Sequence, residues 1–291
     1  MTTAPARPAD LFIEPTAANV APVVPVASGI DAEIATITPD KAREMLRRNT
    51  HNRPIREARV HAYTRLMTGG LWHLNGEAIK IATDGTILDG QHRLLAVVKS
   101  GITIKTLVVT GLPMEAQETM DGGAKRSTGD VFSLRGEQNS AMLASVARKV
   151  WLWDSGDKRF SSKESPSSPE LAALLGQHSG LRRSADIAMR TYQTFRCIPP
   201  SIVGAAHHLA SRIAPDDATW FFQRLGDGAE LSLRHPVLTL RTKAMADKDA
   251  RREVTDGRHM AHVMRAWNAV RDGKTLAVIQ IPADDPVVEP K

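Results

Sequence analysis

Residues 78–101, which decide the fold, read AIKIATDGTILDGQHRLLAVVKSG. Two short runs of β-type residues flank Asp84-Gly85, a dipeptide typical of hairpin turns. Gly90 then separates the second run from an apolar helical run that ends at Gly101. The stretch therefore predicts strand, turn, strand and helix in succession, with a tight glycine bend where the helix begins.

The bend at Gly90 has the features of a phosphate-binding corner. A glycine lets a ligand approach the backbone closely, and the first helical turn offers unpaired N–H groups with a partial positive charge. Arg93, one turn into the helix, adds a forked cation that suits phosphate oxygens. An ordinary surface bend, with Arg93 paired to Asp89, would leave the same pattern. The hypothesis is that Asp89, Gly90, Gln91, His92 and Arg93 bind phosphate.

Length and composition limit the class of protein. The 291 residues suggest one to three domains, and a hydrophobic fraction of 42% suffices for a sizeable core. The net charge of +6 permits nucleotide or nucleic-acid partners without demanding them. A single cysteine, Cys197, excludes a disulfide framework and a cysteine zinc site. No apolar run approaches the ~20 residues of a membrane span, and no secretion signal is evident, so a cytoplasmic location is expected.

The chain predicts an α+β fold in which a small mixed-sheet domain precedes a larger all-helical domain. Proline and alanine without a sustained period indicate a disordered tail at the N-terminus. A helix should begin at Thr38-Pro39, a second should span 56–69, and the last strand of the sheet should span 103–109. The predicted boundaries are 1–35 for the tail, 36–112 for the sheet domain, 113–275 for the helical domain and 276–291 for a C-terminal tail.

Nine helical segments are predicted after Pro113, with a serine-rich loop at 161–168 among them. They are 114–119, 127–134, 139–154, 169–176, 180–194, 200–212, 216–225, 236–246 and 257–271.

Two motifs resemble those of a known family. The string at 89–93 resembles the Gly-x-x-Arg box of the ParB N-terminal and sulfiredoxin superfamily. Asn52-Arg53-Pro54-Ile55 resembles the upstream Asn-x-Arg box, and the helix and hairpin between them follow at similar spacing. The resemblance covers roughly residues 36–112. The wider chain, through 120–127 and 266–271, looks like proteins of actinobacterial phages and hosts that are labelled as ParB-like nuclease domains.

The resemblance implies a nucleoside triphosphate ligand accompanied by magnesium, with Asn52 and Arg53 lining the pocket. A solvated loop before a helix would explain these two residues equally well. Gln91 stands where sulfiredoxins carry a cysteine and where ParB proteins often carry a glutamate that helps hydrolysis. Neither sulfinic-acid repair nor fast hydrolysis by that route is therefore expected. ParB also continues into a helix-turn-helix domain, and no clean one is evident here.

Several other residues are candidates for the same site. Glu77, before the first strand, could act as a general base or be a charge at the strand edge. His92 could transfer protons or shape the turn, and Asp89 could bind a metal or cap the helix. Lys125 and Arg126 follow two glycines and could form a second anion nest over the corner, or lie in a surface turn. No dedicated metal site is predicted.

The helical domain offers weaker signals for DNA. Arg182-Arg183 and the basic run at 241–252 could contact phosphates, although a solvated helix face explains them more simply. The stretch 169–188 has a helix–turn–helix cadence without regularly spaced base-reading residues. Adjacent His207-His208 point about 100° apart and do not form a metal pair.

Three functions remain open. The favoured hypothesis is a ParB-like nucleotide-binding protein that acts in DNA binding or regulation, with DNA as a further candidate partner and no membrane. The alternative is a phosphotransferase or nuclease that uses the Gly90 corner with Glu77 or His92 as base. The third is a non-catalytic regulatory module.

Overall fold

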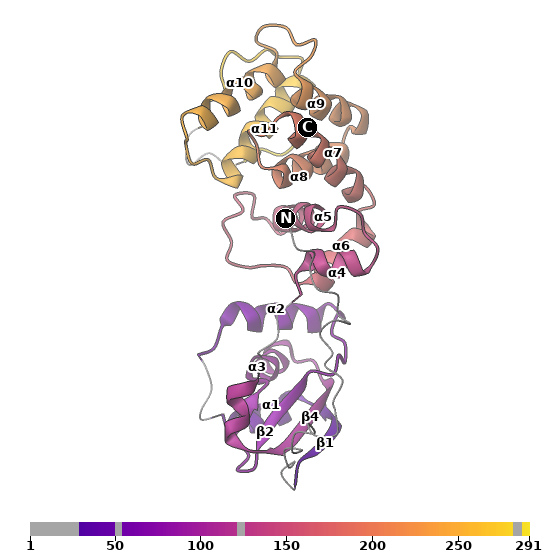
Figure 1. The fold of residues 1–291 in the computed structure, drawn as a ribbon, viewed down its shortest axis with the longest axis vertical. Coiled ribbons are helices and arrows are strands. Elements are labelled where there is room, and N and C mark those ends of the chain that lie inside the picture. The colour runs from indigo at the N-terminus through magenta and orange to yellow at the C-terminus, as the bar shows by residue number, and fades with distance from the viewer. Residues whose placement is uncertain (1–28, 50–53, 121–125, 282–286) are drawn as a thin grey trace, which may run out of the picture.

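The computed structural model describes residues 29–49, 54–120, 126–281 and 287–291. A mixed four-stranded sheet with helices is followed by an all-helical region, as the sequence predicts. The two halves are stacked along the longest axis of the molecule, with helix α2 (Glu57–Thr68) at their junction (Figure 1).

The sheet has the strand order β1-β4-β2-β3. Strand β4 (Ile104–Leu112) pairs antiparallel with β1 (Asp31–Ile37) and parallel with β2 (Ala78–Ala82). Strands β2 and β3 (Ile87–Asp89) form the predicted hairpin around Gly85, whose φ of 86° belongs to the left-handed region.

The prediction that the N-terminal tail extends to residue 35 is wrong, because residues 31–35 belong to strand β1. This edge strand buries only Ala35 and Ile37, and Ile34 is 62% exposed. An edge strand that buries so little has a weak apolar pattern, and the proline-rich residues before it mask the signal. The rest of the tail, residues 1–28, lies outside the described residues.

Three helices accompany the sheet. Helix α1 (Pro39–Leu46) begins where the Thr38 hydroxyl accepts a hydrogen bond from the Lys41 amide, with proline in the first turn. Helix α3 (Gln91–Ser100) lies between α2 and the sheet (Figure 1) and buries Leu94 and Val97 fully. The core that forms around α3 fixes the position of the glycine bend at its N-terminus.

The helical half agrees closely with the predicted segments. Residues 114–119 form a short 3-10 helix, η2 (Met114–Thr119), which precedes the α-helices of the helical half. The others are α4 (Thr128–Leu134), α5 (Ser140–Asp154), α6 (Ser168–Gln177), α7 (Leu181–Thr194), α8 (Pro200–Ser211), α9 (Pro215–Asp227), α10 (Pro236–Asp249) and α11 (Asp256–Arg271).

Helix α8 lies at the centre of the helical core and packs against α5, α7, α9 and α11. Its Gly204 permits close packing, since a Cβ there would lie 2.5 Å from Val146 Cγ2 and 3.1 Å from the Ala188 Cβ. No helix within the described ranges combines the length and the apolar character that a membrane span requires.

The described parts of the predicted C-terminal tail, residues 276–281 and 287–291, pack onto the helical core. Ile279 is fully buried and Val287 is nearly so. The Trp267 indole donates a hydrogen bond to the Lys291 carbonyl at 3.1 Å, and the Lys291 amide donates to Asn268 Oδ1 at 2.9 Å. The apolar run that begins at Leu276 is too short to predict this packing from its periodicity.

Candidate functional site: a cavity at the glycine corner

Gly90 forms the predicted bend between β3 and α3. Its φ of 109° is unfavourable for residues with a side chain, and an added Cβ would lie 3.0–3.2 Å from atoms of Ile79 on strand β2. Both constraints require glycine, so the helix begins with its first turn close against the sheet.

The Arg93 guanidinium is held by the protein itself. Its Nη1 donates to the Glu77 carbonyl at 2.8 Å, and its Nη2 donates to the Ala78 carbonyl at 2.7 Å and to Asp89 Oδ2 at 3.0 Å. Arg93 is only 7% exposed. Arg93 is paired with Asp89, as the alternative interpretation of the sequence had it, and it also reaches carbonyls where β2 begins. These contacts hold the corner together, and phosphate binding by Arg93, which lines the cavity, stays a prediction.

The neighbouring candidate residues are also engaged by the protein. Asp89 Oδ1 accepts a hydrogen bond from the Gly90 amide at 2.7 Å, so its carboxylate stabilises the start of the helix. His92 Nε2 accepts from the Arg56 backbone amide at 3.0 Å, and Gln91 Oε1 accepts from Asn49 at 3.1 Å. These contacts favour the turn-shaping interpretation of His92 over proton transfer.

A cavity of about 490 Å³ opens beside this corner. Its polar lining includes Asp89, Gly90, His92 and Arg93, together with side chains of α2 and of the 71–77 loop. The added polar residues are Arg59, His73, Asn75 and Glu77. The lining contains two arginines, Arg59 and Arg93, and two carboxylates, Glu77 and Asp89, so its formal charge is close to neutral.

The cavity lining also has an apolar and aromatic part. It consists of Tyr63, Leu66, Leu71 and Trp72. The rings of Tyr63 and Trp72 meet edge to face, with centroids 5.6 Å apart and planes at 84°. The Trp72 indole nitrogen is buried and has no hydrogen-bond partner among the residues that the structure describes, which is unusual for a polar group and suits an acceptor supplied by a ligand.

The cavity reaches the helical half of the molecule. Pro169, in the first turn of α6, lines it beside the α2 residues. Arg65 of α2 donates to Glu170 Oε1 at 2.7 Å and to the Ser165 carbonyl at 3.1 Å. Its guanidinium carbon lies 5.3 Å from the centroid of the Trp151 ring. Burial alone would raise the pKa of Glu170, but the hydrogen bond from Arg65, two hydrogen bonds from Ser167 and the Arg65 charge together hold it below its ordinary value.

The other predicted site residues are distributed as follows. Glu77 lines the cavity with an exposed side chain. Arg126 is described and exposed but does not line the cavity, so it does not cover the corner. Asn52, Arg53 and Lys125 lie outside the described residues.

Sequence reasoning missed Arg59, Trp72 and Pro169. Arg59 sits on the polar face of an amphipathic helix, where a solvated charge is the ordinary explanation. Trp72 and Pro169 reach the cavity only through tertiary packing. Within the described residues, no group of three or more His, Cys, Asp or Glu side chains could hold a metal ion.

Comparison with known protein families, with curated proteins and with solved structures finds no match to this chain.

Proposed function

We propose that this chain is a ParB-like nucleotide-binding protein with a regulatory role, and that the cavity beside Gly90 holds a nucleoside triphosphate. The observation that carries the proposal is a single cavity beside a helix N-terminus whose lining combines charged and polar side chains with two aromatic rings. Its volume of about 490 Å³ lies in the range of small-molecule sites.

The phosphates would lie beside Gly90, among the polar side chains of the cavity. Backbone N–H groups and the α3 dipole favour an anion beside Gly90. Arg59 replaces Arg93 as the proposed phosphate ligand, since no ion pair to Arg59 is found among the described residues and its side chain lines the cavity. Glu77 and Asp89 add carboxylate oxygens, which suit the magnesium ion that accompanies a triphosphate.

The base would lie against the aromatic side chains of the cavity. Tyr63 and Trp72 offer apolar ring surface, and the unpartnered Trp72 N–H offers a donor to a base or ribose oxygen. A nucleotide with its base on these rings and its phosphates at Gly90 would contact both the aromatic and the polar lining of the cavity.

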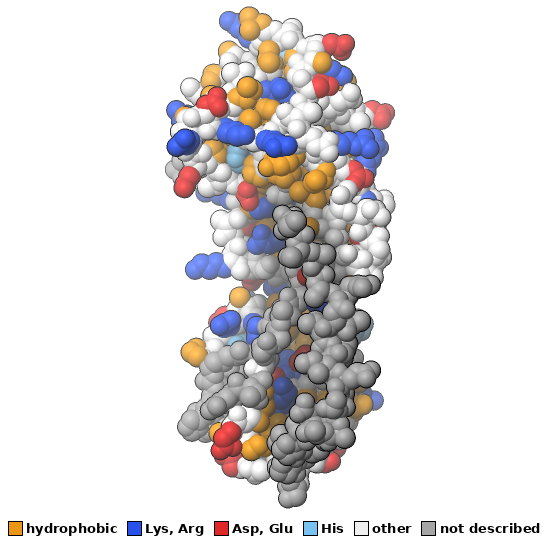
Figure 2. Space-filling model, in the orientation of Figure 1, with side chains coloured by type: hydrophobic (Ala, Val, Ile, Leu, Met, Phe, Trp, Pro, Cys, Tyr) orange, Lys and Arg blue, Asp and Glu red, His pale blue; other side chains and the backbone are white. Residues whose placement is uncertain are grey.

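Helix α2 supports a regulatory role because one helix serves both the cavity and the junction. Arg59 and Tyr63 line the cavity, whereas Arg65 holds the helical half through Glu170. A ligand that pulls on α2 would therefore change how the two halves contact each other. DNA as the downstream partner remains part of the proposal, but on the face that Figure 2 shows, basic and acidic side chains of the helical half are interspersed.

No specific observation favours the enzymatic alternative. His92 Nε2 already accepts a backbone hydrogen bond, and the Glu77 side chain is exposed.

Calorimetric titration of the full chain with ATP, CTP, GTP and UTP, each with magnesium, tests the proposal. We expect at least one nucleotide to bind at a single site, and Arg59→Ala to weaken it about tenfold through loss of a charge-assisted contact. Arg135→Ala is the matched control, because Arg135 is exposed and does not line the cavity, and this variant should bind the nucleotide as tightly as the wild type does. The proposal fails if folded protein binds none of the four.

A further inference from the structure

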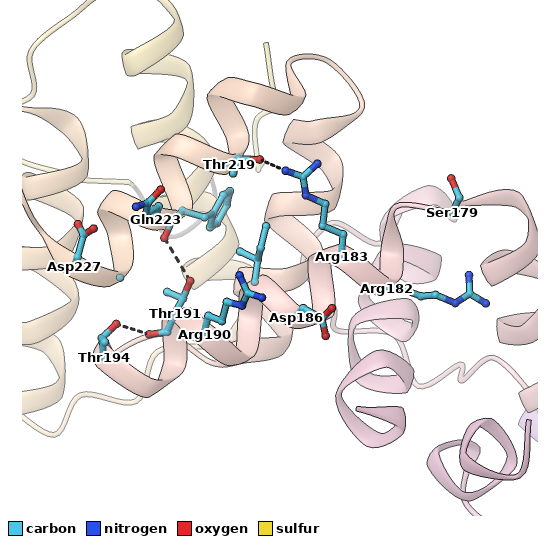
Figure 3. A pocket seen from close by; sticks show the side chains of 13 residues that line it. Ser179, Arg182, Arg183, Asp186, Arg190, Thr191, Thr194, Thr219, Gln223 and Asp227 are labelled. Atoms are coloured by element: carbon cyan, nitrogen blue, oxygen red, sulfur yellow. Dashed lines mark hydrogen bonds between the residues drawn. The ribbon is translucent and has the colours of Figure 1, made fainter. Parts of the chain in front are cut away.

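A second cavity, of about 680 Å³, lies in the helical half between α7 and α9 (Figure 3). Ile187 of α7 and Phe222 of α9 give it an apolar floor. Thr191, Thr219 and Gln223 add hydroxyl and amide groups to its walls. No residue of this groove lines the Gly90 cavity, so the two are independent.

Contacts between the two helices fix the width of the groove. At one end, Arg183 Nη2 donates to Thr219 Oγ1 at 3.0 Å. Towards the other end, Thr191 Oγ1 donates to the Phe222 carbonyl at 3.4 Å, and a Cβ at Gly226 would lie 3.2 Å from Thr194 Oγ1. The groove is therefore a preformed concavity in the fold rather than a gap between loosely packed helices.

Two arginines of α7 give the groove its charge. Arg183 and Arg190 point into the space between the helices, as Figure 3 shows. Arg183 has a neutral hydroxyl as its hydrogen-bond partner, and no acidic partner of Arg190 is found in the described parts of the chain. The charge of Arg183, second to burial, also helps to lower the pKa of the neighbouring His207 to about 4.

Arg182 differs from these two arginines. It also lines the groove, but its guanidinium extends away from Arg183 and Arg190 (Figure 3), and its Nε and Nη2 both donate to the Glu137 carboxylate, the former at 2.8 Å. These hydrogen bonds, together with the Glu137 charge, raise the pKa of Arg182 above its ordinary value, and the ion pair neutralises its charge. Arg182 therefore provides a natural control on the same helix.

We propose that the α7–α9 groove binds a small organic anion, with a flat apolar body on Ile187 and Phe222 and one carboxylate, sulfonate or phosphate group between Arg183 and Arg190. The concave shape and apolar floor match a small-molecule site. A nucleic-acid backbone fits less well, because Asp186 and Asp227 also line the groove and would repel a polyanion.

The test uses the dye 8-anilinonaphthalene-1-sulfonate and its uncharged analogue N-phenyl-1-naphthylamine, each titrated into the folded full chain by fluorescence. We expect the sulfonate to bind at one site, and Arg190→Gln and Arg183→Gln each to weaken it about tenfold. Arg182→Gln should leave the affinity unchanged, and the neutral analogue should bind about equally to all four proteins.

Circular dichroism shows first that each variant is folded, and Arg190→Gln, which removes no hydrogen bond found in the structure, keeps the test valid if Arg183→Gln is unstable. Equal sulfonate binding by the wild type, Arg190→Gln and Arg182→Gln would overturn the proposal. So would displacement of the dye by a duplex oligonucleotide at lower concentrations than by 1-naphthyl phosphate, because that result would assign the groove to nucleic acid.

Discussion

Replacing Arg93 by alanine tests whether this residue clasps the corner or faces a ligand. The substitution removes three hydrogen bonds from a charged donor, to the Glu77 and Ala78 carbonyls and to the Asp89 carboxylate. It leaves the Asp89 charge, on a side chain that is 20% exposed, without its partner. The loss falls on the bend that positions both β2 and α3.

The magnitude follows from this geometry. Breaking a buried ion pair by removing one partner costs about 3–5 kcal/mol. The Asp89 carboxylate keeps some solvent, so the lower part of that range applies, and we expect a loss of about 3 kcal/mol in the free energy of unfolding. Arg59→Ala is the matched control: Arg59 only lines the cavity, and its loss should change stability by less than about 0.5 kcal/mol.

Urea denaturation followed by far-ultraviolet circular dichroism measures both variants. Asp89→Asn should destabilise by less in the Arg93→Ala background than in the wild type, because the two residues are coupled. The reasoning is refuted if Arg93→Ala matches the wild type in stability, or if its cost and that of Asp89→Asn are simply additive.

Three further outcomes follow from the structure. Arg65→Ala should loosen the junction between the two halves and cost about 1–3 kcal/mol, seen as faster proteolysis between residues 155 and 167, where Arg65 holds the Ser165 carbonyl; unchanged cleavage would contradict it. Gly204→Ala should lower the thermal midpoint by overpacking against Val146, at about 1–3 kcal/mol, although alanine is the better helix former; a raised midpoint would disprove that close contact. Burial lowers the pKa values of His207 and His208 to about 4 and about 3, from 6.5. Both stay neutral in the fold, so stability should be complete near pH 7 and fall as pH drops from about 6.5 towards 4; a urea midpoint at pH 5 equal to that at pH 7.5 would show otherwise.

The elements with strong local signals were predictable from the sequence. Asp84-Gly85 between two alternating runs fixes a hairpin, and Thr38-Pro39 fixes a helix start, because turns and caps depend on a few adjacent residues. The helices of the C-terminal half have apolar stripes at helical spacing and end near the expected residues. The glycine bend at Gly90 belongs to this class, since its conformation is a local property.

The parts that depend on tertiary contacts were not predictable. An arginine one turn into a helix suits a phosphate and a backbone carbonyl equally well, and only the fold brings the Ala78 carbonyl within 2.7 Å of Arg93. Strand β1 pairs with a segment about 70 residues away along the chain, which leaves no local pattern beyond its alternation. Trp72 reaches the cavity for a similar reason, through packing against Tyr63 of α2.

The most direct test of the central claim is a crystal structure of the full chain with magnesium and the nucleotide that binds most tightly. We expect phosphates beside the Gly90 bend, the Arg59 guanidinium in contact with them, and the base against the ring surface of Tyr63 or Trp72. A nucleotide found elsewhere on the chain, with the Gly90 cavity filled only by solvent, would contradict it.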